Sequence, residues 1–174
     1  MPCSFAPIID GNTRILVIGT MPGAVSLERQ EYYAHERNLF WKVVSETFCG
    51  GRPFASYEEK KACLAGNHIG LWDSVQSCHR VGSLDSAIKN AVPNDFAALL
   101  KQYPRTQRLL FNGQKAFGLF ERFYPDIFVP TSPDIPECFS SFFSPLSFSQ
   151  SADSVWFSTC ARTFEYALAA SPFI

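Results

Sequence analysis

The chain has 174 residues, 47% of them hydrophobic, and its formal net charge is −1. This length and composition fit one domain with a substantial core, and we expect a single domain over residues 1–174. The near-neutral charge argues against a broad basic face that wraps long DNA, yet it leaves room for a small basic patch around one nucleotide.

Membrane, secretory and metal-binding classes are also disfavoured. There is no run of about 18 apolar residues and no basic-then-apolar leader, so we expect no membrane span and a cytoplasmic location. The six cysteines contain no Cys-x-x-Cys pair, and the three histidines lack metal-ligand spacing. We therefore expect no metal, no iron–sulfur cluster and no other cofactor.

Strand patterns recur along the chain. Residues 1–13 form a proline-containing lead-in that we expect to pack across a sheet edge. Ile15 to Gly19 form a buried strand pattern that ends in a turn containing glycine and proline. Further strands are predicted at residues 68–72, 109–111 and 127–129.

Helical patterns lie between these strands. The apolar spacing of residues 40–48 predicts a helix that stops at Gly50-Gly51. Ser56 and Glu59 have the spacing of a capping box, which opens a helix that closes near Gly66. The remaining predicted helices run from Asn94 to Tyr103, from Gln114 to Tyr124, and from Ser151 or Asp153 to Leu168.

This alternation predicts an α/β fold: a three-layer α/β/α sandwich with a central, mostly parallel sheet of about four strands. Ligands of such sheets bind beyond the carboxyl ends of the strands. Polar segments lie at those ends, at residues 19–22, 73–74, 112–113 and 131–132. Residues 78–85 form a further irregular stretch, which is long enough to indicate a functional loop. On these residues alone the rim predicts only a site for a small ligand or a nucleotide.

The loop after the first predicted strand excludes two common classes of nucleotide-binding site. No Gly-Lys-Ser/Thr follows Gly23, and the glycine spacing does not match a dinucleotide fingerprint. Gly19-Thr20-Met21-Pro22-Gly23, then Tyr33-Ala34-His35, then Asn38-Leu39-Phe40-Trp41-Lys42 resemble the first motif region of the uracil-DNA glycosylase superfamily. The likeness is to the mismatch-specific branch and its hypoxanthine (deoxyinosine) DNA glycosylase relatives, and the string from Arg80 to Asp85 is also similar to the hypoxanthine group.

The resemblance implies a monofunctional DNA repair glycosylase. Such an enzyme hydrolyses the N-glycosidic bond of a deaminated base in DNA: hypoxanthine, or alternatively uracil or xanthine. Many members carry Asp or Asn in the first loop to position water, where this chain has Met21, whose thioether cannot polarise water. In the hypoxanthine-type group the critical asparagine is the one that matches Asn38, so the resemblance implies Asn38 as the catalytic residue.

The resemblance also implies the partners of the site. The partner is damaged DNA presented as one extruded nucleotide, bound by a monomer without metal or membrane. The implied base-binding residues are Gly19, Thr20, Met21, Pro22, Tyr33, Phe40 and Asn112. The implied DNA-backbone contacts are Thr131, Ser132, Arg80 and Ser83.

Some of these residues also have purely structural interpretations. Asn38 has the position of a helix N-cap, Asn112 that of a strand-ending turn, and Tyr33 could be a core aromatic. Asp134 in the second motif would repel phosphate, and the segment after residue 123 is rich in phenylalanine, with Arg162 as its only basic residue. A non-catalytic nucleic-acid or nucleotide binder, or an interaction protein using its tail, is therefore an alternative.

Overall fold

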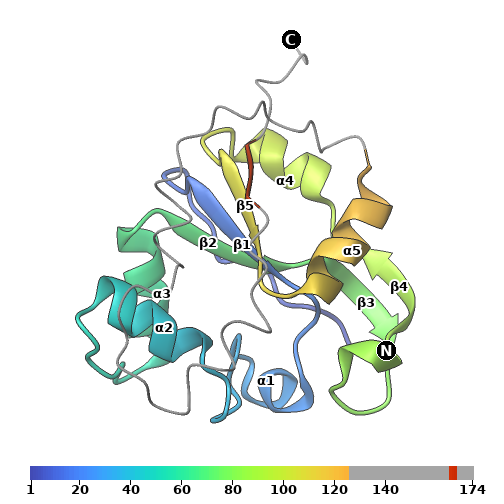
Figure 1. Ribbon diagram of the computed structural model, residues 1–174, viewed down its shortest axis with the longest axis horizontal. Helices are drawn as coiled ribbons and strands as arrows, with labels where there is room; N and C mark the ends of the chain where they lie inside the picture. Colours follow the sequence, from blue (N-terminus) through green and yellow to red (C-terminus); the bar gives the residue numbers. More distant parts are fainter. Residues whose placement is uncertain (126–164, 168–174) are drawn as a thin grey trace, which may run out of the picture.

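The computed structural model describes residues 1–125 and the backbone of residues 165–167. A four-stranded sheet of order β2-β1-β5-β6 forms its centre (Figure 1). The strands are β1 (Ile15–Gly19), β2 (Ile69–Asp73), β5 (Arg108–Phe111) and β6 (Glu165–Ala167). β1 pairs in parallel with β2 and β5, whereas β6 pairs antiparallel to β5. The mostly parallel sheet predicted from the sequence is thereby confirmed.

Helices cover both faces of this sheet, with α2 (Phe40–Phe48) and α3 (Tyr57–Gly66) on one side and α4 (Phe96–Gln102) and α5 (Gln114–Phe123) on the other (Figure 1). Alternation along β1 divides its side chains between two cores. Leu16 and Ile18 are fully buried in the cluster that contains Phe96 and Phe120. Val17 packs against the cluster on the opposite face. The three-layer sandwich follows from this alternation.

Local signals explain where the helices begin. The Ser56 hydroxyl accepts the Glu59 N–H at 3.2 Å, as the capping box predicts. The predicted cap of α4 was wrong by one residue, because Asp95 is the cap and its carboxylate accepts the Ala98 N–H at 2.9 Å. Asn94 instead turns inward, and its Nδ2 donates to the Asp73 carbonyl at 2.7 Å. A short helix, α1 (Ala24–Arg29), was not predicted.

The segment after β2 is more regular than the sequence indicated. β3 (Val75–His79) and β4 (Lys89–Pro93) form a separate antiparallel pair, and η1 (Asp85–Ala87) is a 3₁₀ turn between them. Register shifts interrupt this pair, so burial along β3 does not alternate cleanly and the period of two is hidden. The predicted irregular loop therefore shrinks to residues 80–84.

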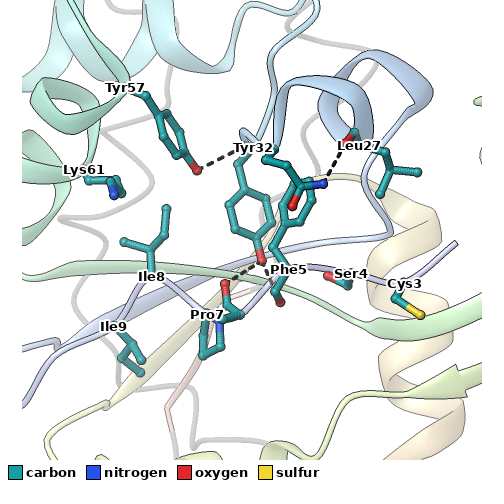
Figure 2. Close-up of a pocket in the computed structure, with 12 residues that line it drawn as sticks. Cys3, Ser4, Phe5, Pro7, Ile8, Ile9, Leu27, Tyr32, Tyr57 and Lys61 are labelled. Atoms are coloured by element: carbon teal, nitrogen blue, oxygen red, sulfur yellow. Dashed lines mark hydrogen bonds between the residues drawn. The ribbon is translucent and has the colours of Figure 1, made fainter.

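The amino-terminal segment crosses the edge of β2, as predicted. Ile8 forms an isolated bridge with Leu71, and the Trp72 indole N–H donates to the Phe5 carbonyl at 3.1 Å. Tyr32 lies against this segment, with its hydroxyl donating to the Phe5 and Ala6 carbonyls (Figure 2).

Several predicted features lie outside the described residues: the strand at 127–129, Thr131, Ser132 and most of the carboxy-terminal helix. Where the chain is described again, at residues 165–167, it is β6, so the helix predicted to extend to Leu168 is wrong there. Pairing with the open edge of β5 overrides the helical spacing.

Candidate active site

A cavity of about 290 Å³ lies beyond the carboxyl ends of β1, β2 and β5. The register of the sheet explains its position, because Gly19 pairs with Asp73, and Ile18 pairs with Phe111 just before Asn112. The loops that follow these three strands therefore open at one place. The lining residues are Thr20, Met21, Pro22, Gly23, Ser26, Tyr32, Tyr33, His35, Asn38, Asp73, Ser83, Asp85 and Asn112.

Asp73 contributes a buried carboxyl group to this cavity; the sequence placed residues 73–74 at the rim but assigned Asp73 no role. Its side chain is 3% exposed, and Oδ2 accepts a hydrogen bond from the Ser4 hydroxyl at 2.7 Å. Burial raises the pKa of Asp73 from 3.8 to about 7, against the lowering effect of the Ser4 hydrogen bond and of Arg80. Asp73 is therefore poised to be neutral or ionised near neutral pH.

Gly19 makes room for two polar groups of the site. A Cβ atom at this position would lie 2.5 Å from Asp73 Oδ1 and 2.9 Å from the Tyr33 hydroxyl oxygen. The sequence predicted that Gly19 would bind the base directly, yet Gly19 does not line the cavity. Its missing side chain lets Asp73 and Tyr33 approach the strand end instead.

Tyr33 has an unusual conformation with φ of +52°, which is uncommon for a residue other than glycine. Its ring stacks on Phe40 with centroids 4.1 Å apart and an angle of 27° between planes. Phe40 therefore lies behind Tyr33 and does not line the cavity, contrary to its predicted contact with the base.

The hydroxyl group of Tyr33 points to where a ligand would bind. It is buried, and within the described residues it has no hydrogen-bond partner. Burial raises the pKa of this phenol, and the nearby Asn112 amide offsets only part of the rise, without forming a hydrogen bond of normal geometry. A buried donor without a partner is costly, which is typical of a group that awaits a ligand.

Asn38 lines the cavity just before α2. Leu39 is the N-cap of α2, so the predicted cap position was wrong by one residue, although Asn38 Oδ1 does accept the Phe40 N–H at 2.9 Å. This hydrogen bond occupies the oxygen and orients the side chain. The Nδ2 donors remain for a ligand in the cavity.

Arg80 and Ser83, which were predicted to contact the DNA backbone, connect the loop after β3 to the segment after β1 by hydrogen bonds. The Arg80 side chain is 1% exposed, donates to the Pro22 carbonyl, and lies 3.8 Å from Asp85. Ser83 Oγ accepts the Ala24 N–H at 2.9 Å. Burial of Arg80 excludes the predicted phosphate contact in this conformation, whereas Ser83 does line the cavity.

The other predicted residues of the first loop lie at the cavity with little exposure. Thr20 is 7% exposed and Met21 6% exposed, and Met21 packs in a cluster with Val75 and Leu119. The thioether therefore contributes to the core as well as lining the cavity. Asn112 follows β5, where its N–H donates to the Ile18 carbonyl at 2.8 Å.

A second, larger cavity of about 810 Å³ lies between the amino-terminal segment and the residues around Tyr57 (Figure 2). None of the predicted site residues lines it. Within residues 1–125 no group of His, Cys, Asp and Glu could hold a metal ion. No helix of the described part is long and apolar enough to cross a membrane.

Comparison with known proteins shows the family of the chain. The model of the Uracil DNA glycosylase superfamily matches residues 6–157, and the chain belongs to this superfamily. Two curated relatives, from Methanosarcina barkeri and Methanosarcina acetivorans, are named hypoxanthine DNA glycosylase. They are 37% and 38% identical to the chain over 112 residues, which cover 64% of this chain and 71% of each relative.

A solved structure shows the same fold. The solution NMR structure of a candidate uracil DNA glycosylase from Methanosarcina acetivorans matches with a TM-score of 0.62 and 36% identity. The match covers 71% of this chain and 76% of that one. The family resemblance and the α/β architecture expected from the sequence are both confirmed.

Proposed function

We propose that this protein is a monofunctional DNA repair glycosylase that removes a deaminated base, hypoxanthine first, from DNA. The observation that carries the proposal is the buried, unpartnered Tyr33 hydroxyl beside the Asp73 carboxyl in a cavity at the strand ends. The superfamily membership and the names of the two curated relatives support it.

The reaction replaces the bond between the sugar C1′ and the base nitrogen with a bond between C1′ and a water oxygen. Negative charge grows on the departing base while the sugar gains oxocarbenium character, and a proton from water ends on the base. Fixed hydrogen-bond donors aimed at the base lower this barrier. Among the described residues, the cavity lining has no lysine that could form a Schiff base with the sugar, which favours hydrolysis alone.

Three side chains supply such donors in this proposal. The Tyr33 hydroxyl and neutral Asp73 donate to acceptors of the base. Ser4 already donates to Oδ2 of Asp73, so Oδ1, which faces Gly19 and Tyr33, is the atom that bears the proton. Asn38 Nδ2 donates to the departing base or holds the attacking water. Asn112, Thr20, Met21 and Pro22 complete the wall around the base.

The protonation state of Asp73 matters for this chemistry. An ionised carboxylate beside a base that is becoming anionic would oppose its departure, whereas a neutral carboxyl donates a hydrogen bond to it. Protonated Asp73 is therefore the active form.

An excision assay tests the proposal. Oligonucleotides containing hypoxanthine, uracil or xanthine are incubated with the protein and treated with alkali, which cleaves the strand at an abasic site. We expect cleavage of the hypoxanthine strand. Binding without cleavage of any of the three would support the non-catalytic alternative instead.

A further inference from the structure

Two polar side chains end close to each other where β1 and β2 reach the cavity. A Cβ atom on Gly19 would lie 2.5 Å from Asp73 Oδ1 and 2.9 Å from the Tyr33 hydroxyl oxygen, so both oxygens flank one point. Both side chains line the cavity. Within the described residues the Tyr33 hydroxyl has no hydrogen-bond partner, so it does not donate to Asp73. A base in the cavity therefore meets two adjacent groups that are free to donate.

The two groups differ in how readily they release a proton. The Ser4 hydroxyl donates to Asp73 Oδ2 at 2.7 Å, so neutral Asp73 carries its proton on Oδ1, beside Tyr33. Burial raises the pKa of Asp73 to about 7, although the Ser4 hydrogen bond and Arg80 act in the other direction. Burial raises the pKa of the Tyr33 phenol well above its ordinary value. Asp73 is therefore the member of the pair that can give up its proton near neutral pH.

Hypoxanthine presents a matching pair of acceptors. In a 6-oxopurine, O6 and N7 are neighbouring acceptors on one edge, whereas adenine has an amino donor beside N7. Uracil has no counterpart of N7. Protonation of N7 also neutralises the negative charge that grows on a departing purine. A proton donor placed at N7 therefore acts where the reaction needs it.

We propose that Asp73 is a general acid that transfers its Oδ1 proton to N7 of the departing purine, while the Tyr33 hydroxyl donates to O6. This inference rests on the proposed function and goes beyond hydrogen bonding, because the proton changes its bond. The bond between C1′ and N9 breaks, and its electron pair passes into the base as N7 takes the proton. The water oxygen bonds to C1′, and a proton of that water returns to the Asp73 carboxylate through solvent. The base leaves neutral, and Asp73 is restored.

Asp73→Asn separates proton transfer from hydrogen bonding. Because Ser4 donates, the amide oxygen takes the place of Oδ2, and the amide NH₂ group at the place of Oδ1 still donates to N7. The amide cannot release a proton, so at about pH 6 we expect single-turnover excision of hypoxanthine to fall about 10²–10⁴-fold. Binding of a strand whose hypoxanthine nucleotide resists hydrolysis through a 2′-fluoro group should change less than about threefold, since the hydrogen bond is kept.

Two altered bases and a control variant complete the experiment. N7-methylhypoxanthine already carries positive charge at the imidazole ring and needs no proton, so Asp73→Asn should cut it at the wild-type rate. In 7-deazahypoxanthine a C–H group replaces N7, so wild type should cut it at least about 100-fold more slowly than hypoxanthine. Asp95→Asn, which changes the exposed N-cap of α4 outside the cavity, is the matched control and should cut hypoxanthine like wild type.

The outcomes distinguish the acid from the function. Excision of hypoxanthine by Asp73→Asn within about threefold of wild type would leave Asp73 as a hydrogen-bond donor only and overturn the acid. An equal loss on N7-methylhypoxanthine would also overturn it and make Asp73 a positioning residue. Wild-type excision of 7-deazahypoxanthine at the hypoxanthine rate would overturn it without any variant. In these three cases the glycosylase proposal stands, whereas absence of wild-type cleavage of hypoxanthine overturns the function and the acid together.

Discussion

At the scale of single residues, Asp73 links the chemistry of the site to pH. Its pKa of about 7 arises from burial, so the neutral form predominates below that pH and the carboxylate above it. If neutral Asp73 is the active form, excision should decline as pH rises through about 7. The Asp73→Asn variant stays neutral and keeps a donor, so its rate should lose this pH dependence. A wild-type rate that instead rises through about pH 7 would contradict this role.

Asp73 also makes the stability of the fold depend on pH, which can be measured independently of activity. Because the folded pKa of Asp73 is raised above its ordinary 3.8, the unfolded chain loses this proton first as pH increases. Stability from Asp73 is complete below about pH 4 and is lost as pH rises toward 7. Asp73→Asn should therefore melt above wild type at pH 8, with the difference shrinking toward pH 4. Each unit of pKa shift corresponds to about 1.4 kcal/mol, so the effect should be measurable by calorimetry.

The hydroxyl group of Tyr33 can be tested by its removal in Tyr33→Phe. The family resemblance implies that Tyr33 binds the base, and a role as a stacking ring alone would make Tyr33→Phe harmless and Tyr33→Ala damaging. The structure places the ring on Phe40 and leaves the hydroxyl unpartnered. We therefore expect Tyr33→Phe to lower single-turnover excision about 10- to 100-fold, since one hydrogen bond to a developing charge is lost.

The melting temperature separates the two interpretations of Tyr33. The hydroxyl has no partner in the described chain, so Tyr33→Phe should melt at or above the wild-type temperature. Wild-type excision by Tyr33→Phe, with loss only in Tyr33→Ala, would restore the stacking role.

At the scale of elements, the end of β1 can be tested through Gly19. An added methyl group would lie 2.5 Å from Asp73 Oδ1, closer than such atoms approach without displacement. Gly19→Ala should therefore shift Asp73 and Tyr33 and reduce excision by about 100-fold or more, because a misplacement of about 1 Å is enough for such a loss. Gly66→Ala, where nothing lies within 4 Å, is the matched control and should cut like wild type. Equal rates for both variants would show that this approach is unimportant.

The elements that could be predicted are those with simple periodicity. β1 and β5 have continuous apolar runs, and α2, α3 and α5 have clear apolar or capping patterns, so the structure confirms them within about a residue. β3 and β4 could not be predicted, because register shifts break their alternation. The short α1 has no side-chain hydrogen bond at its cap that would have marked its start.

The site could be predicted from the sequence only where its residues belong to a recognisable motif. Asn38, Tyr33, Asn112 and the first loop follow motif resemblance, and the structure brings them to one cavity. Residues 73–74 were placed at the rim, but Asp73 was given no role, because an acidic residue after a strand also serves simply to end it. The pairing of Gly19 with Asp73, on neighbouring strands that are far apart in the sequence, brings this carboxyl to the site, where it is buried.

At the scale of the whole molecule, segments that are far apart in the sequence combine to build the site in a chain of low net charge. Ser4 from the amino-terminal segment reaches Asp73 across the edge of β2, and loops after β1 and β3 are fastened together by Arg80 and Ser83. The formal charge of −1 leaves little general attraction for DNA. Recognition in this proposal therefore depends on the cavity more than on a broad basic surface.

In the proposed mechanism Asn38 acts on the base or the water and does not merely support α2. Asn38→Asp retains an oxygen that accepts the Phe40 N–H, so the start of α2 should be preserved. The change removes the Nδ2 donor and places negative charge beside the departing base, which should lower the rate about 10²–10³-fold. Asn38→Ala should lose a similar rate and about 1 kcal/mol of stability.

The most direct measurement is single-turnover excision of hypoxanthine from an oligonucleotide, with a thermal melt of each protein, for wild type, Asn38→Asp and Asn38→Ala. We expect Asn38→Asp to melt at the wild-type temperature and to cut at a rate at least about 100-fold below wild type. If both variants remain folded and cut at near wild-type rates, Asn38 is not the catalytic residue. In that case a gain of uracil excision in Met21→Asn would place the chemistry in the loop after β1.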